Sequence, residues 1–205
     1  MKSGKLDVVV TSRAAECNAL WIINHLRSQV YRDLLGRVTY LPITNRNQEE
    51  WSCEVQNHSF SILYHSKHQG RINLTDVTDS LYDLELQELS KTLGRGNVMV
   101  VVDDLQKSDE EEKQRILKNQ PSISQWASQL LLFAENEKNP ISTQKQQVLL
   151  QTFQTEEGHT CGGNRMFDIF CSQKIVQEER NLLDVTTGGP AGTYHTRQSL
   201  GNLSK

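Results

Sequence analysis

The chain of 205 residues has few of the features that mark secreted or membrane-spanning proteins. Its unbroken apolar runs, such as Val98–Val102, are far shorter than the ~20 residues that cross a bilayer, and Met1–Lys5 leads into no apolar signal core. The four cysteines are scattered without a C-x-x-C pair, so we expect free thiols rather than a disulfide framework or a zinc site. These absences predict a cytoplasmic protein that contacts no membrane.

The net charge is also small, since 25 acidic and 22 basic residues give a formal charge of −3. This balance offers no positive field, so we expect no nucleic-acid partner. Acids nevertheless concentrate between Asp76 and Glu112, where eleven acids and three bases leave a local charge of −8. We predict an acidic surface that binds a protein with a basic surface, through Glu110, Glu111 and Glu112. Solubility and complementation of a helix dipole are the alternative explanation.

Short apolar runs alternate with segments of helical spacing over the first two-thirds of the chain. The runs predict strands at Leu6–Val10, Val38–Ile43, Phe60–Tyr64, Val98–Val102 and Leu130–Phe133. Apolar spacings of three and four, together with capping residues, predict helices at 14–35, 45–55 and 80–93, after Ser108, and from Pro121. Pro42 places the second strand at or near a sheet edge.

This alternation is typical of an α/β protein with helices on both faces of a mainly parallel sheet. Five strands favour a flavodoxin-like, doubly wound order of 2-1-3-4-5. The alternative is a less regular α/β sheet with an antiparallel edge. We assign 1–135 to this domain, 136–183 to a partly helical extension and 184–205 to a disordered tail rich in Gly, Ser and Thr.

Ligands of open α/β sheets bind beyond the carboxyl ends of the strands, where the strand order reverses. In the predicted order this crevice lies between the first and third strands, and Ser12, Arg13, Ser66 and Lys67 are its candidate phosphate contacts. Alternatively, Ser12 is only a helix cap and Arg13 a solvated surface residue. Asp103 and Asp104 would stand beside the crevice, but no G-x-x-x-x-G-K-[ST] motif accompanies them, so we expect no metal site.

Three segments resemble the Toll/interleukin-1 receptor family of signalling domains. Asp7–Ser12 is similar to the opening strand of that family, and Phe60–Ser66 is similar to its third strand. Ser80–Leu86 is similar to the stretch where the family has Ser-Trp-Cys-x-x-Glu-Leu, although Leu81 and Tyr82 replace the Trp-Cys pair. In members that cleave NAD the glutamate of that motif is catalytic, so the resemblance implies that role for Glu85.

Three functions are consistent with these observations. The first is an intracellular protein-interaction module without catalytic activity or cofactor. The second is an enzyme that binds NAD or another nucleotide in the crevice, with Glu85 as its acidic residue. The third is a structural subunit that docks into a larger assembly. A nucleotide that raises the melting temperature would favour the second, because ligands stabilise the native state that binds them.

Overall fold

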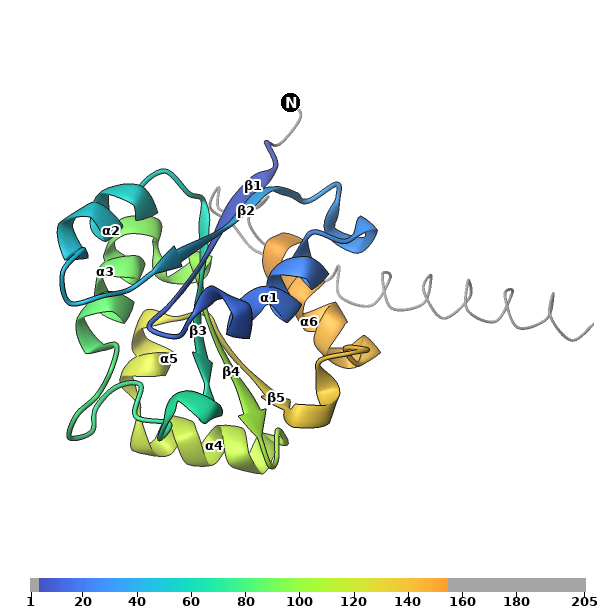
Figure 1. Ribbon diagram of the computed structural model, residues 1–205. Helices are drawn as coiled ribbons and strands as arrows, with labels where there is room; N and C mark the ends of the chain where they lie inside the picture. Colours follow the sequence, from blue (N-terminus) through green and yellow to red (C-terminus); the bar gives the residue numbers. More distant parts are fainter. Residues whose placement is uncertain (1–3, 155–205) are drawn as a thin grey trace, which may run out of the picture. The chain divides into compact units, whose positions relative to one another are not determined.

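The computed structural model describes residues 4–154, which fold into one α/β layer structure (Figure 1). A five-stranded sheet has the order β2-β1-β3-β4-β5, and every neighbouring pair is parallel. Its strands are β1 (Leu6–Ser12), β2 (Leu35–Pro42), β3 (Phe60–Ser66), β4 (Val98–Leu105) and β5 (Gln129–Ala134). The predicted flavodoxin-like order is therefore confirmed, and no strand of the described part forms an antiparallel edge.

Helices cover both faces of the sheet, as Figure 1 shows. The helices are α1 (Glu16–Leu26), α2 (Gln48–Val55), α3 (Asp83–Leu93), α4 (Glu110–Asn119), α5 (Ser122–Trp126) and α6 (Thr143–Gln154). Short 3-10 turns lie at η1 (Gln29–Tyr31), η2 (Lys67–Gln69), η3 (Arg95–Asn97) and η4 (Glu135–Glu137). One apolar cluster packs α1 and α6 on one face, and a second packs α2 to α5 on the other.

Alternation along the strands explains this division. Val8, Val10 and Phe60 belong to the cluster beneath α1 and α6, whereas Leu63 and Val100 belong to the opposite cluster. Successive strand residues point to opposite faces, so a strand that is buried on both sides reads as a continuous apolar run. This is why Val98–Val102 was predictable as a central strand.

The first helix is shorter than the predicted 14–35. α1 ends at Leu26, a 3-10 turn follows, and β2 already begins at Leu35. Leu35 pairs with Leu6 in the sheet, and the Leu6 backbone N–H donates to the Leu34 carbonyl at 2.9 Å. Pairing with β1 therefore overrides the helical spacing of the last apolar residues. β2 is an edge strand, as Pro42 predicted.

The segment after residue 135 begins by packing onto the sheet. Leu149 and Phe153 of α6 are buried in the same cluster as α1, and Ile141 joins them. Phe153 meets the rings of Tyr31 and Phe60 edge to face, at centroid distances of 6.0 and 5.0 Å. The predicted domain end at 135 thus lies before the last helix of this core, while the predictions for 155–205 fall outside the described residues.

None of the helices in residues 4–154 has the length and apolar character that crossing a bilayer requires.

Candidate functional site

The strand order reverses between β1 and β3, and the carboxyl ends of these strands hold the predicted crevice residues. Arg13 follows β1 directly and reaches across to the chain that enters α3. Its Nε donates to the Leu81 carbonyl at 2.8 Å, and its Nη1 donates to Asn45 Oδ1 at 2.8 Å. Its Nη2 contacts Glu85 Oε1 at 2.5 Å. One guanidinium therefore joins the ends of β1, β2 and the start of α3.

Glu85 is the acidic partner of this link, and it is only 7% exposed. The Arg13 side chain is 28% exposed, so solvent reaches the cation but hardly reaches the carboxylate. Tyr82 also contacts Arg13, since the Arg13 backbone N–H donates to the Tyr82 hydroxyl oxygen at 3.3 Å. Burial raises the pKa of Tyr82, which keeps this phenol protonated.

His65 lies beneath Tyr82, near the end of β3, with ring centroids 5.9 Å apart. It is 1% exposed, and its Nε2 has no hydrogen-bond partner within the described residues. Burial lowers the pKa of His65 to about 4, although a hydrogen bond with the Arg71 backbone acts in the opposite direction. A neutral imidazole with a free ring nitrogen therefore lies under the switch point.

The other predicted phosphate contacts already have internal partners. Ser12 is buried, and its Oγ accepts from the Ala14 backbone N–H at 2.9 Å. Ser66 Oγ donates to Asp104 Oδ2 at 2.5 Å. Lys67 is exposed and donates to the Gly70 carbonyl at 3.2 Å. Of the four, Arg13 alone reaches Glu85, and the phosphate role of all four stays a prediction.

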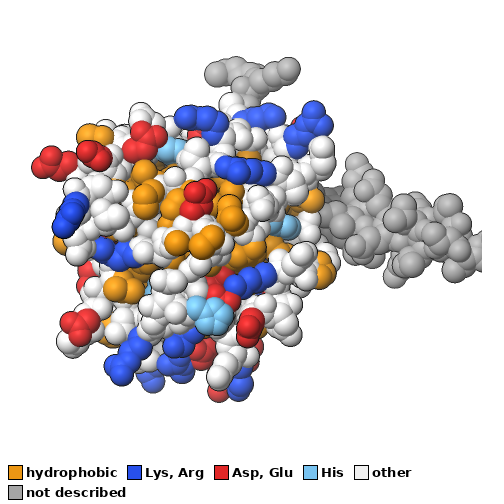
Figure 2. Space-filling view, in the orientation of Figure 1, with side chains coloured by type: hydrophobic (Ala, Val, Ile, Leu, Met, Phe, Trp, Pro, Cys, Tyr) orange, Lys and Arg blue, Asp and Glu red, His pale blue; other side chains and the backbone are white. Residues whose placement is uncertain are grey.

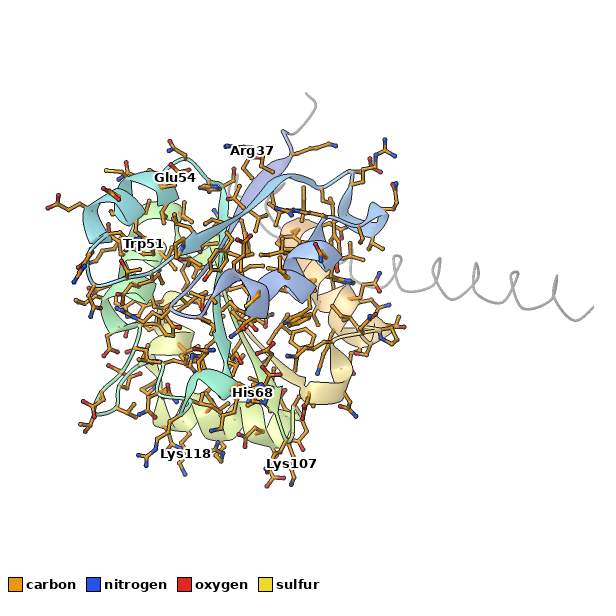
Figure 3. All side chains as sticks on the ribbon, viewed as in Figure 1. Arg37, Trp51, Glu54, His68, Lys107 and Lys118 are labelled. Carbon is orange, nitrogen blue, oxygen red and sulfur yellow. The ribbon has the colours of Figure 1, made fainter. Side chains whose placement is uncertain are left out.

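A second polar cluster lies at the ends of β3 and β4, where Figure 3 labels His68. Asp103 is fully buried, and its Oδ2 accepts from Trp21 Nε1 and from the Tyr64 hydroxyl, both at 2.8 Å. Lys138, which follows β5, pairs with Asp103 Oδ2 at 2.9 Å and also contacts Asp104. Both acids were considered in the sequence analysis, but no sequence pattern predicts that Lys138 contacts them.

The backbone of Asp104 explains how two consecutive carboxylates meet one ammonium group. Neighbouring strand residues normally point to opposite faces. Asp104 has φ 59°, in the left-handed region, and the pairing of β4 with β5 shifts register at this point. This irregularity brings both carboxylates to Lys138. Burial raises the pKa of Asp103, and contacts with Lys138 and Ser66 lower that of Asp104.

A cavity of about 840 Å³ adjoins the Arg13 link. It is lined by residues 45–53 and Glu88, and Figure 3 labels Trp51 on this side of the molecule. Asn45 lines the cavity and also accepts the hydrogen bond from Arg13. Glu88 lies one helical turn after Glu85 and accepts from Ser52 Oγ at 2.9 Å. The volume of this cavity falls within the ~300–1,000 Å³ typical of small-molecule sites.

The eleven acids of 76–112 do not form one acidic surface. Glu85 and Asp103 are buried, Asp104 pairs with Lys138, and Glu112 pairs with Arg115 at 2.6 Å. Glu110 and Glu111 remain exposed at the start of α4. Asp109, rather than Ser108, caps this helix, because its Oδ1 accepts from the Glu112 backbone N–H at 2.9 Å. Figure 3 labels the basic residues Lys107 and Lys118 beside the same helix.

Cys17 and Cys53 are free thiols, and no group of three His, Cys, Asp or Glu side chains in residues 4–154 is arranged to hold a metal ion.

Comparison with known proteins assigns no family to the chain. No protein-family model matches the chain, and no curated protein matches it. Among solved structures, it is similar to an NADPH-quinone reductase from P. pentosaceus, at 12% identity and a TM-score of 0.38. That match covers 77% of this chain and 100% of the other. The resemblance to Toll/interleukin-1 receptor domains stays a prediction.

Proposed function

We propose that the chain binds a nucleotide at the carboxyl edge of its sheet, in the cavity that residues 45–53 and Glu88 line. Arg13 supplies the phosphate contact, and Glu85 and Glu88 accept hydrogen bonds from ribose hydroxyls. The observation that carries the proposal is the position of Arg13, which pairs with Glu85 and also donates a hydrogen bond to Asn45 of the cavity lining. The open α/β architecture favours ligands at this place.

The charges of the pair suit the two ends of a nucleotide. A guanidinium binds phosphate through two parallel hydrogen bonds, and this side chain is accessible to solvent. A phosphate oxygen competes with Glu85 for Nη2, which frees the Glu85 carboxylate for a neutral hydroxyl donor. Carboxylates in this role recognise ribose in other dinucleotide-binding α/β sheets.

Glu85 is also the candidate catalytic residue if the nucleotide is processed. It lies on the first turn of α3, beside the Tyr82 hydroxyl, in a site where little water reaches the carboxylate. A shielded carboxylate can transfer a proton or stabilise a developing positive charge on a sugar. The supporting features are its burial and its single strong partner, Arg13.

The test is a thermal-shift titration of the full chain with NAD, ATP, GTP and a flavin nucleotide. A ligand at one hundred times its dissociation constant stabilises the native state by about 2.7 kcal/mol, which raises the melting temperature of a domain this size by roughly 5–10 °C. The double variant Arg13→Gln/Glu85→Gln removes both charges together, so it leaves no unpaired buried charge. It should lose the shift.

Arg95→Gln is the matched control, because Arg95 is an exposed arginine that donates to the Ser124 carbonyl and does not line the cavity. It should retain the shift. No shift with any of the four nucleotides, or an equal shift in the double variant, would overturn the proposal. If NAD is consumed, Glu85→Gln should slow its turnover by about 10²–10⁴-fold.

A second candidate is protein binding through the first turn of α4. Glu110 and Glu111 are exposed there, and no ion pair within the described residues involves either of them. Reversal of both to Lys should weaken capture of a basic partner, whereas Glu16→Lys, an exposed acid on α1, should not. This candidate requires no nucleotide, so the thermal-shift experiment separates it from the first.

A further inference from the structure

A second cavity lies at the opposite edge of the sheet, where β1 and β2 begin. It measures about 370 Å³. The lining residues that matter here are Lys5, Leu26, Arg27, Tyr31, Arg32 and Leu35, and the whole lining contains no acid. Three of these are cationic. Figure 2 shows Lys and Arg side chains gathered at the top of that view, where β1 begins in Figure 1.

The three cations of this cavity have no acidic partner in the part of the chain that the structure describes. Lys5 Nζ donates to the Arg32 carbonyl at 2.7 Å, and Arg27 Nη2 donates to the Val38 carbonyl at 2.6 Å. Arg32 Nη1 donates to Gln29 Oε1 at 3.3 Å. These are neutral acceptors, so the positive charges remain uncompensated. By contrast, the neighbouring Arg37 pairs with Asp7 at 2.9 Å.

The floor of the cavity is apolar. Leu26, Tyr31 and Leu35 are buried in the apolar cluster beneath α1 and α6. Ser28 also lines the cavity, and its hydroxyl has no hydrogen-bond partner among residues 4–154. A low-dielectric floor strengthens the field of cations held at its rim. The three positive charges around this cavity therefore attract an anion.

We propose that this cavity is a binding site for a compact anion with two or more phosphate groups, held by Lys5, Arg27 and Arg32. Guanidinium groups match phosphate oxygens in pairs, and a lysine adds a point charge. Three positive charges suit a multiply charged phosphate better than a single carboxylate. The small volume limits the ligand to a pyrophosphate unit or the phosphorylated ring of a headgroup.

This site is independent of the proposed nucleotide site. Its residues come from the start of β1, the end of α1 and η1, whereas Arg13 and Glu85 lie at the carboxyl edge. Figure 3 shows Arg37 near the first edge and His68 near the other. Failure of one site would therefore leave the other intact.

The test is calorimetric titration of the full chain with inorganic pyrophosphate, at two salt concentrations. Binding should be detectable at 50 mM salt and several-fold weaker at 200 mM, because screening reduces contacts between exposed charges. The variant Lys5→Gln/Arg32→Gln removes two of the three charges and should weaken binding at least tenfold. It leaves Arg27 and its contact with β2 in place.

Lys91→Gln/Arg95→Gln is the matched control, since it removes two exposed charges from the end of α3 and from η3. It should bind as the unmodified chain does. Equal losses in the two variants would show a nonspecific charge effect and overturn the proposal. Arg32→Glu should abolish binding while the melting temperature in the absence of anion changes little.

Vesicles distinguish a lipid headgroup from a free anion. Phosphatidylcholine vesicles with and without a phosphoinositide bisphosphate are sedimented with the full chain. Headgroup-dependent sedimentation that Lys5→Gln/Arg32→Gln removes would assign the site to a lipid headgroup. Pyrophosphate binding without sedimentation would assign it to a free anion, and absence of both would overturn the proposal.

Discussion

At the scale of single residues, His65 is the most strongly perturbed base near the candidate site. Burial holds its pKa at about 4, and the positive charge of Lys67 acts in the same direction. In the unfolded chain the imidazole has a pKa near 6.5. Between these values the unfolded chain carries the proton and the folded chain does not. The free energy of unfolding therefore falls as the pH falls through this window.

We predict that His65→Asn flattens this pH dependence between pH 6.5 and 5. The slope attributable to one such histidine reaches about 1.4 kcal/mol per pH unit. Burial also lowers the pKa of His25, so the variant should retain part of the slope. Urea unfolding at pH 7, 6 and 5 measures the difference, and identical slopes for the two proteins would contradict the prediction.

The candidate site shows which residue-scale features a sequence can supply. Arg13 and Glu85 were each named from the sequence, because one follows the first strand and the other lies in the segment that resembles a family motif. Their contact at 2.5 Å could not be predicted, since it depends on how residues 71–82 fold over the sheet. Asn45 and Tyr82, which complete the link, carry no spacing that a sequence pattern would detect.

At the scale of elements, α6 completes the cover of one sheet face. Its burial rests chiefly on Leu149 and Phe153, in a segment otherwise rich in Gln. Such a sparse apolar face resembles an independent extension when the sequence alone is considered. The aromatic partners of Phe153 lie in η1 and β3, more than 90 residues earlier in the chain. Strands that are buried on both faces, by contrast, can be predicted from their continuous apolar composition alone.

We predict that Phe153→Ala lowers the free energy of unfolding by about 3–5 kcal/mol, the range for removal of a buried aromatic ring. Gln154→Ala changes an exposed neighbour on the same helix and should shift stability by less than about 0.5 kcal/mol. The urea midpoints of the two variants provide the measurement. Similar midpoints would mean that α6 contributes little to the core.

At the scale of the whole molecule, Lys138 joins segments that are distant in sequence. Its ammonium group contacts the two acids at the end of β4, and Asp103 in turn accepts from Trp21 of α1 and Tyr64 of β3. Lys145 of α6 pairs with nearby Glu137 at 2.5 Å and also donates to Ser108 Oγ, just after β4, at 2.9 Å. These contacts connect the carboxyl edge of the sheet to the segment between β5 and α6. The candidate ligand site thus lies at an edge of the sheet that ion pairs stabilise in addition to apolar packing.

We predict that Lys138→Met destabilises the fold by about 3 kcal/mol at pH 7, the lower end of the range for loss of one partner from a buried ion pair. Without the ammonium group, the pKa of Asp103, which burial already raises, increases further, and the pKa of Asp104 loses the lowering effect of Lys138. Stabilisation from a raised carboxyl pKa is present at low pH and is lost as the pH increases. The deficit of the variant should therefore shrink as the pH falls from 7 to 5.

Lys91→Met serves as the control, because Lys91 is exposed and no ion pair in residues 4–154 includes it. Its stability should match that of the unmodified chain at both pH values. A Lys138→Met deficit that is equal at pH 7 and pH 5 would mean that packing of the lysine stem, rather than its charge, stabilises this edge. An exposed aspartate stays ionised between pH 7 and 5, whereas burial raises the carboxyl pKa toward this range. The pH dependence therefore reports on whether the unpaired acids remain buried at this edge.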